Sequence, residues 1–249
     1  VKTYFGNYGK IPTMEITSET PIRENAVELP AAIPVLERLN IDYCCGGKHT
    51  LAEACAKSDL SVILVLEELE HQRQNASSLK TPWQTAPLKQ LTAHIVQKHH
   101  AFARGHLDLI RELAAKVERR HGASHPEVFQ VSEAFASISA ELTHHFFCEE
   151  TVLFPYFAQL EVEQNPALAA AFGNVQQPVT RMMMDHAHAG DELRLLREIT
   201  NNYQPPADAC TTYRALYHAL ADLEQGLHQH IHLENNILFP RVLAAAKEQ

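Results

Sequence analysis

The sequence predicts an all-α protein whose larger part is a four-helix bundle made of two copies of one helical hairpin. Apolar residues recur every three or four positions through the second half, as at Leu107 and Ile110, and no convincing period-2 pattern predicts a strand. The pattern His, three residues, Glu, three residues, Leu-Phe-Pro occurs at residues 145–155 and again at 230–240, an offset of 85 residues. Such an internal repeat is characteristic of duplicated structural units.

A lone histidine precedes each copy of this pattern by 44 or 45 residues. The natural turns lie at Gly122-Ala-Ser124 and near Pro205-Pro206, close to the middle of each interval. At about 1.5 Å per helical residue the two arms of the first hairpin are each roughly 32 Å long, so an antiparallel pair returns to its starting level. We therefore expect six side chains to meet in one layer of the bundle: His100, His145, Glu149, His186, His230 and Glu234.

The chain before the bundle predicts a separate, smaller helical domain. We interpret residues 1–20 as an N-terminal extension, 21–75 as a small helical domain and 76–87 as a polar, Pro-terminated linker. Pro30 and Pro34 favour two short helices over one continuous helix in the small domain.

The bundle itself is predicted over residues 88–249. Its four long helices are expected at roughly 88–121, 125–160, 176–202 and 207–246, with a long crossover between the second and the third. Pro155 and Pro240 fall inside helical patterns, so a kink is expected at each.

Composition excludes several classes of function. The net charge of −9, with no local basic stripe, argues against a nucleic-acid surface. No apolar run approaches the roughly 18 residues of a membrane span. Five cysteines, two of them adjacent, make a poor disulfide framework, so a reducing cytoplasm is the expected location.

The repeated residues predict a metal site. A His and a Glu four positions apart on a helix project from one face, and both are metal ligands. Four imidazoles and two carboxylates are too many for one zinc ion and suit two iron ions, although manganese accepts the same donors. Glu149 and Glu234 are each expected to bridge the two ions, together with one oxo or hydroxo group. Glu141, one turn before His145, is the expected hydrogen-bond acceptor for the outer nitrogen of a ligand.

Two interpretations remain open for Cys44-Cys45, which precede Gly46-Gly47. The pair forms either a packed turn, in which cysteine acts as a small hydrophobe, or an exposed pair of thiols that takes up iron, nitric oxide or a sulfur species.

Three stretches carry a family resemblance: Asp42-Tyr-Cys-Cys-Gly-Gly-Lys48, the Pro82-Trp83 junction, and the segment from Thr211-Thr to Leu-Glu-Asn-Asn-Ile-Leu-Phe-Pro240. They closely resemble the bacterial di-iron proteins for repair of iron centres, which join a small Cys-Cys-Gly-Gly domain to a hemerythrin-like bundle. The resemblance implies two iron ions, with terminal ligands His100, His145, His186 and His230 and bridging ligands Glu149 and Glu234. It also implies a homodimer that restores iron–sulfur clusters after nitrosative or oxidative stress.

Hemerythrins that carry oxygen have a second histidine four residues after the one on the third helix, and Gly190 occupies that position here. The missing ligand favours a centre that reacts with small molecules or gives up its metal. We therefore expect a repair protein that donates iron to damaged iron–sulfur proteins, with Cys44 or Cys45 handing the metal on or reducing the site. The alternatives are a nitric oxide reductase that forms nitrous oxide, and a sensor of nitric oxide or oxygen.

Overall fold

The computed structural model describes residues 16–75, 82–160 and 175–247. The first fifteen residues of the expected extension, the first half of the expected linker and residues 161–174 of the expected crossover lie outside the described residues. The chain divides into two compact units. The first comprises Val1–Asp42 with Gly47–Lys80, and the second comprises Tyr43–Gly46 with Thr81–Gln249.

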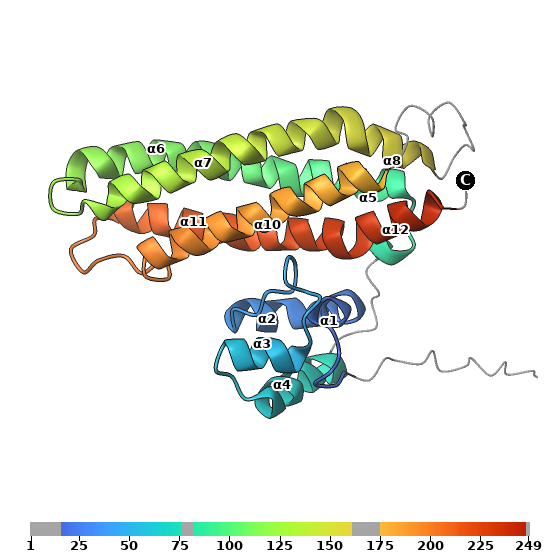
Figure 1. The fold of residues 1–249 in the computed structure, drawn as a ribbon. Coiled ribbons are helices and arrows are strands. Elements are labelled where there is room, and N and C mark those ends of the chain that lie inside the picture. Colours follow the sequence, from blue (N-terminus) through green and yellow to red (C-terminus); the bar gives the residue numbers. More distant parts are fainter. Residues whose placement is uncertain (1–15, 76–81, 161–174, 248–249) are drawn as a thin grey trace, which may run out of the picture. The chain divides into compact units, whose positions relative to one another are not determined.

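Among its described residues, the first unit contains four α-helices, drawn in blue and cyan in Figure 1. They are α1 (Ile22–Glu28), α2 (Ile33–Arg38), α3 (Leu51–Lys57) and α4 (Val62–Asn75). A 3-10 turn at Pro30–Ala32 separates α1 from α2, so the expected pair of short helices is confirmed. Thr50 begins α3 with a capping box, because its hydroxyl accepts from the backbone N–H of Glu53 and the Glu53 carboxylate accepts from the Thr50 N–H.

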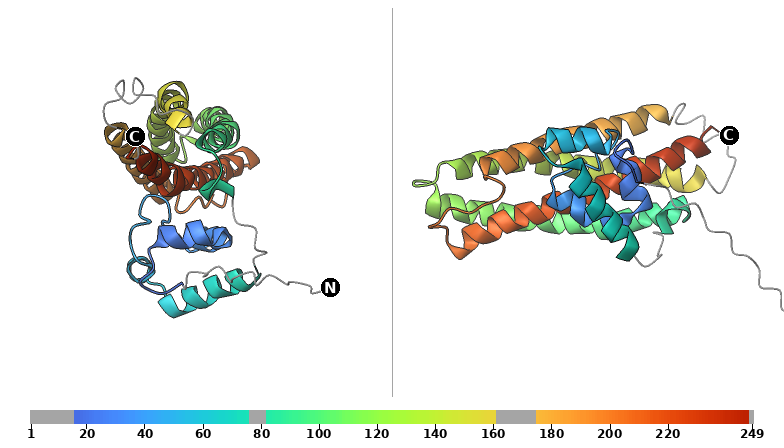
Figure 2. Two further views of the ribbon diagram at one scale, coloured as in Figure 1. Left: turned by 90° about the vertical axis from the view of Figure 1, so that its right-hand side faces the viewer. Right: turned by 90° about the horizontal axis from the view of Figure 1, so that it is seen from below.

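The second unit is a bundle of four long helical rods that run side by side (Figures 1 and 2). The first rod contains α5 (Leu88–His94) and α6 (Ala101–His121), and the second contains α7 (Glu127–Cys148) and α8 (Phe154–Leu160). The third rod is α10 (Gln176–Ile199), and the fourth contains α11 (Thr211–His232) and α12 (Phe239–Ala245). No β-strand occurs in the described residues, and the predicted all-α fold is confirmed.

Apolar side chains fill the bundle from its turn end, where α6 joins α7 and α10 joins α11, toward the level of the repeated motifs. Leu107 and Ile110 of α6 are buried with Ile138 of α7 and Leu220 and Leu223 of α11 in one continuous core. The helical period of the sequence places these residues on inward faces, and their burial removes apolar area from water at about 25 cal/mol per Å². The motif residues lie beyond this apolar core, where polar side chains replace it.

Three rods contain a π-helical segment: Ile95–His100, Glu149–Leu153 and Leu233–Leu238. In the second and third of these segments the backbone N–H just before a proline donates to a carbonyl five residues back. Phe154 donates to Glu149 and Phe239 to Glu234. Proline has no N–H and clashes with the carbonyl four residues earlier, and a π turn accommodates both effects without breaking the helix. Where kinks were expected, the structure has π segments.

In the part of the chain that the structure describes, no helix combines the length and the apolar composition that a membrane span requires.

Candidate metal centre

All six residues of the repeated pattern converge inside the bundle. Each hairpin contributes one histidine from its first rod, His100 or His186, and a His-Glu pair from its second rod. The π segments contain His100, Glu149 and Glu234, whereas the other three histidines lie on regular α-helix. Every one of the six side chains is buried, and both carboxylates are fully shielded from solvent. The equal arm lengths of the hairpins explain why they reach one level.

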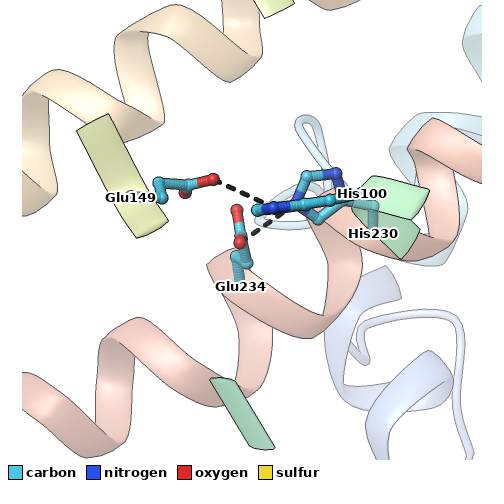
Figure 3. Close-up of side chains that lie close together, drawn as sticks. All are labelled: His100, Glu149, His230 and Glu234. Carbon is cyan, nitrogen blue, oxygen red and sulfur yellow. Dashed lines mark ion pairs between the residues drawn. The ribbon is translucent and has the colours of Figure 1, made fainter. Parts of the chain in front are cut away.

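The six residues form two groups of four that share both carboxylates. Figure 3 shows the first group, in which the Nε2 atoms of His100 and His230 lie 3.3 Å from Glu149 Oε2 and 3.0 Å from Glu234 Oε1, respectively. We call this the inner position. In the second group, Glu149 Oε1 lies 3.2 Å from His145 Nε2, and Glu234 Oε2 lies 3.0 Å from His186 Nε2. We call this the outer position.

Most of the nitrogen and oxygen atoms that face each other at the two positions lack hydrogen bonds and are arranged as ligands of metal ions. Both oxygens of Glu149 and of Glu234 are buried without a hydrogen-bond partner, as are Nε2 of His100 and of His230. Burying an ionised carboxylate without a partner is costly, and a cation removes that cost. Nitrogen and oxygen donors in these proportions suit iron, zinc or manganese, and two shared carboxylates suit two adjacent ions. The centre is therefore a metal site.

Polar side chains hold the outer nitrogens of two histidines. Glu150 Oε1 accepts from His100 Nδ1 at 2.6 Å, and Arg104 Nη1 lies 2.9 Å from the same oxygen. Asn235 Oδ1 accepts from His186 Nδ1 at 2.9 Å. Such contacts fix the tautomer of the ring, so that Nε2 faces the metal with its lone pair.

The other two ligand histidines have no such acceptor. Nδ1 of His145 and Nδ1 of His230 are buried without a hydrogen bond, and Asp185 Oδ2 lies 3.7 Å from His145 Nδ1. The expectation that Glu141 holds a ligand was wrong, because its carboxylate faces His188 Nε2 at 3.2 Å.

Sequence reasoning missed Glu150, Asn235 and Asp185. Each of them directly neighbours an expected ligand in the sequence, and that adjacency was the available signal.

Electrostatics within the centre favour a bound cation. Burial would lower the pKa of His145, but Glu149, Glu234 and Asp185 together outweigh it and raise this pKa to about 9. Burial would raise the pKa of Glu234, yet His230 and His186 hold it well below the usual range. Both carboxylates are therefore ionised at neutral pH and place two negative charges in a space from which water is excluded.

A cavity of about 200 Å³ reaches the centre from one side. Its wall includes His145, His186 and His230 but not His100. Polar and charged side chains surround these three histidines: Glu141, His144, Arg181, Asp185 and His188. The cavity gives a small molecule a route to the outer position.

The adjacent cysteines lie outside the two His-Glu groups of metal donors. Their sulfur atoms lie 3.8 Å apart, and Cys45 Sγ lies 3.4 Å from the backbone oxygen of His186. Cys44 is buried and Cys45 is half-buried, so the alternative of two exposed thiols is wrong for Cys44. A Cβ atom added at Gly190 would lie 3.6 Å from Cys45 Sγ, an ordinary van der Waals distance, so the cysteine loop packs beside α10 at this glycine.

Comparisons with known proteins agree with this geometry. Residues 91–242 match the Hemerythrin HHE cation binding domain, and residues 18–73 match a domain of unknown function, DUF542. The chain is 37% identical over 227 residues to the Iron-sulfur cluster repair protein YtfE of Shigella boydii serotype 4 and to that of Escherichia coli O157:H7. The protein of the same name from Citrobacter koseri is 36% identical. Each alignment covers 91% of this chain and 97% of the relative.

The resemblance inferred from the cysteine motif and the repeated His-Glu pattern is thereby confirmed for both parts of the chain. The chain belongs to the family of these iron–sulfur cluster repair proteins, in which a DUF542 domain precedes a hemerythrin HHE cation-binding domain.

Proposed function

We propose that this chain repairs iron–sulfur clusters by supplying iron from a centre that holds two iron ions joined by an oxo or hydroxo bridge. The observation that carries the proposal is the pair of buried carboxylates, each with one oxygen toward each pair of histidines. The names of the relatives, which state iron–sulfur cluster repair, support the same activity.

The residues have distinct roles in this proposal. His100, His145, His186 and His230 each donate one ring nitrogen, and Glu149 and Glu234 bridge the two positions. Bound iron supplies the ion that a damaged cluster has lost. With metal bound, a shift of Glu149 or Glu234 toward one pair of histidines would loosen the other position, while the histidines of the first would remain in place. The acceptor is an iron–sulfur protein damaged by nitric oxide or oxygen species.

Cys44 and Cys45 serve the transfer in this proposal. Cys45 Sγ lies beside the backbone of His186, one of the ligands of the outer position. A thiolate is a good iron ligand, so either cysteine is suited to hand the metal on. Full repair by a protein in which Cys44 and Cys45 are both replaced by Ala would remove this part of the proposal.

The test measures the iron bound to this protein and the recovery of the acceptor's iron–sulfur cluster in the same reaction. Iron-loaded protein is mixed anaerobically with a nitric-oxide-damaged acceptor, with sulfide and a reductant supplied, and nitrous oxide is monitored. We expect protein-bound iron to fall as the acceptor regains its cluster, with His186→Ala inactive and Glu141→Ala fully active as the matched control. Nitrous oxide accumulating over many turnovers with all iron retained would instead identify a nitric oxide reductase. Reversible binding of nitric oxide or oxygen, without iron transfer and without nitrous oxide production, would identify a sensor.

A further inference from the structure

The two metal positions are related by the internal repeat but are not equivalent. The offset of 85 residues that relates Glu149 to Glu234 also relates Glu150 to Asn235. Each of these last two residues holds the lone histidine of its own hairpin, His100 in the first and His186 in the second. One hairpin therefore uses a carboxylate where the other uses a neutral amide.

The inner position holds its histidine from several directions. His100 is fully buried, and its ring centroid lies 4.3 Å from that of the stacked Phe146 ring. Its second stacking contact, with Phe154 at 5.8 Å, has a counterpart in the outer position, where His186 stacks on Phe239 at 5.9 Å. Glu150 accepts from its outer nitrogen at 2.6 Å, and Arg104 holds Glu150. A carboxylate acceptor increases the electron density on the ring and strengthens its bond to a metal.

The outer position is held less firmly. His186 has the amide of Asn235 on its outer nitrogen, and an amide draws the ring proton less strongly than a carboxylate does. His145 has no hydrogen bond there, because Asp185 is 3.7 Å away and is paired with Arg181 at 2.9 Å. Both histidines also line the cavity, where water or an acceptor's ligand can replace them, whereas only His230 of the two inner histidines lines it. Nδ1 of His230, in the inner position, also lacks a hydrogen bond. The missing hydrogen bond at His145 therefore does not distinguish the two positions.

We propose that the outer position, between His145 and His186, releases its metal first, while the inner position, between His100 and His230, retains it. This rests on the proposed function, since it names which ion is supplied for repair. Release is a ligand exchange without electron transfer. The nitrogens of His145 and His186 and one oxygen each of Glu149 and Glu234 are replaced around the departing ion by water or by the acceptor's ligands.

The direct test removes one metal and locates the other. The full-length protein is loaded with ferrous iron, one equivalent is removed with a chromogenic chelator, and crystals of the product are measured at the iron absorption edge. We expect the anomalous signal between His100 and His230 and little signal between His145 and His186. Equal signals, or the opposite distribution, would overturn the proposal.

Reciprocal variants test the cause. Wild-type protein should lose iron to the chelator in a fast and a slow phase of equal amplitude. Asn235→Glu should slow the fast phase about 10-fold, and Glu150→Asn should speed the slow phase by a similar factor, as expected for changes behind a metal-bound histidine. The matched control Asn236→Glu adds the same charge one residue later, where the side chain faces His232, and should change neither phase more than about 2-fold.

Failure of the proposed release order can be distinguished from failure of the proposed function. If Glu150→Asn speeds the fast phase and Asn235→Glu leaves that phase unchanged, the positions are assigned in the wrong order, whatever the protein does with acceptors. If the phases behave as expected but no iron reaches a damaged acceptor protein, the asymmetry stands and the proposed function fails. A variant that does not fold leaves the wild-type diffraction measurement to decide.

Discussion

The Nε2 atoms of His145 and His186 lie 3.1 Å apart, although the residues come from different rods and stand 41 positions apart in the chain. Each nitrogen also faces one oxygen of a buried carboxylate, Glu149 for His145 and Glu234 for His186. Two imidazole nitrogens and two carboxylate oxygens directed at one small volume form the donor set of a cation. The same arrangement on the other side of the carboxylates makes Glu149 and Glu234 common to both positions.

Replacing a carboxylate that belongs to both positions should therefore remove more metal than replacing a histidine that belongs to one. His186→Ala removes a donor from one position, so metal content should fall from about two ions per chain to about one. Glu149→Ala removes a donor from both positions, so content should fall well below one. Metal analysis of purified protein measures both values. Glu141→Ala, whose side chain faces His188 at the cavity, should keep both ions. Two ions retained in Glu149→Ala would show that this carboxylate does not bridge.

Removal of the metal should destabilise the bundle. Glu149 and Glu234 are fully buried, and without a metal ion their charges are balanced only by protons on neighbouring histidines such as His145. A ligand present at 100 to 1,000 times its dissociation constant stabilises the folded state by about 3–4 kcal/mol. At about 2–4 °C per kcal/mol for a chain of this size, chelation should lower the Tm by about 6–16 °C. Calorimetry with and without chelator measures the shift.

The double variant Glu149→Gln with Glu234→Gln provides the control for that measurement. It lacks both charges and should bind little metal, so its Tm should not respond to the chelator. A wild-type Tm that does not change on chelation would mean that the folded state does not depend on a bound cation.

The convergence of the six metal-site residues was predictable, whereas their surroundings were not. The offset of 85 residues and the constant rise of a helix fix the level that each side chain reaches, so spacing alone placed His100 near His145. Which neighbour then contacts a ring depends on the rotation of one helix against another. That rotation placed Glu150 behind His100 and turned Glu141 toward His188. A single sequence does not determine this angle.

The backbone around the prolines was likewise only partly predictable from the sequence. Pro155 and Pro240 indicated that the helices would be disturbed, and the disturbance is present. The missing N–H of proline disturbs the regular hydrogen-bond ladder, and here the disturbance takes the form of a π segment before each proline. The sequence left open whether Cys44 is packed in a turn or exposed, because its burial depends on contacts made far along the chain. Its backbone oxygen, for example, accepts from Asn235 Nδ2 at 3.3 Å.

A buried ion pair joins the third and fourth rods away from the metal centre. Arg197 on α10 donates from Nε and Nη2 to the carboxylate of Glu224 on α11, and Glu224 is almost fully buried. Arg197→Ala leaves that charge without its partner, which should cost about 3 kcal/mol of unfolding free energy. Urea unfolding of metal-loaded protein measures it. Replacing the pair together, by Arg197→Met with Glu224→Leu, should recover most of the loss.

Arg194→Ala is the matched control for this pair. Arg194 lies on the same helix and contacts Asp191, but both side chains are exposed, so the change should stay within about 0.5 kcal/mol. Equal losses for Arg194→Ala and Arg197→Ala would contradict the role assigned to burial.

His125 should make the stability of the turn end of the bundle depend on pH. Asp208 at 3.1 Å and Glu127 at 2.9 Å raise the pKa of His125 above its usual value of about 6.5. Because the folded pKa exceeds the unfolded one, the stabilisation is complete below pH 6.5 and is lost as the pH rises through the folded pKa. The Tm of wild type should therefore exceed that of His125→Asn by more at pH 5.5 than at pH 9. A ring titration of His125 followed by NMR should give a midpoint above 6.5. The double variant Asp208→Asn with Glu127→Gln is the control, since it removes both carboxylates, and the NMR midpoint of His125 should fall in it. A midpoint for His125 at or below 6.5, or a Tm difference that grows toward pH 9, would show that the two carboxylates do not hold its proton.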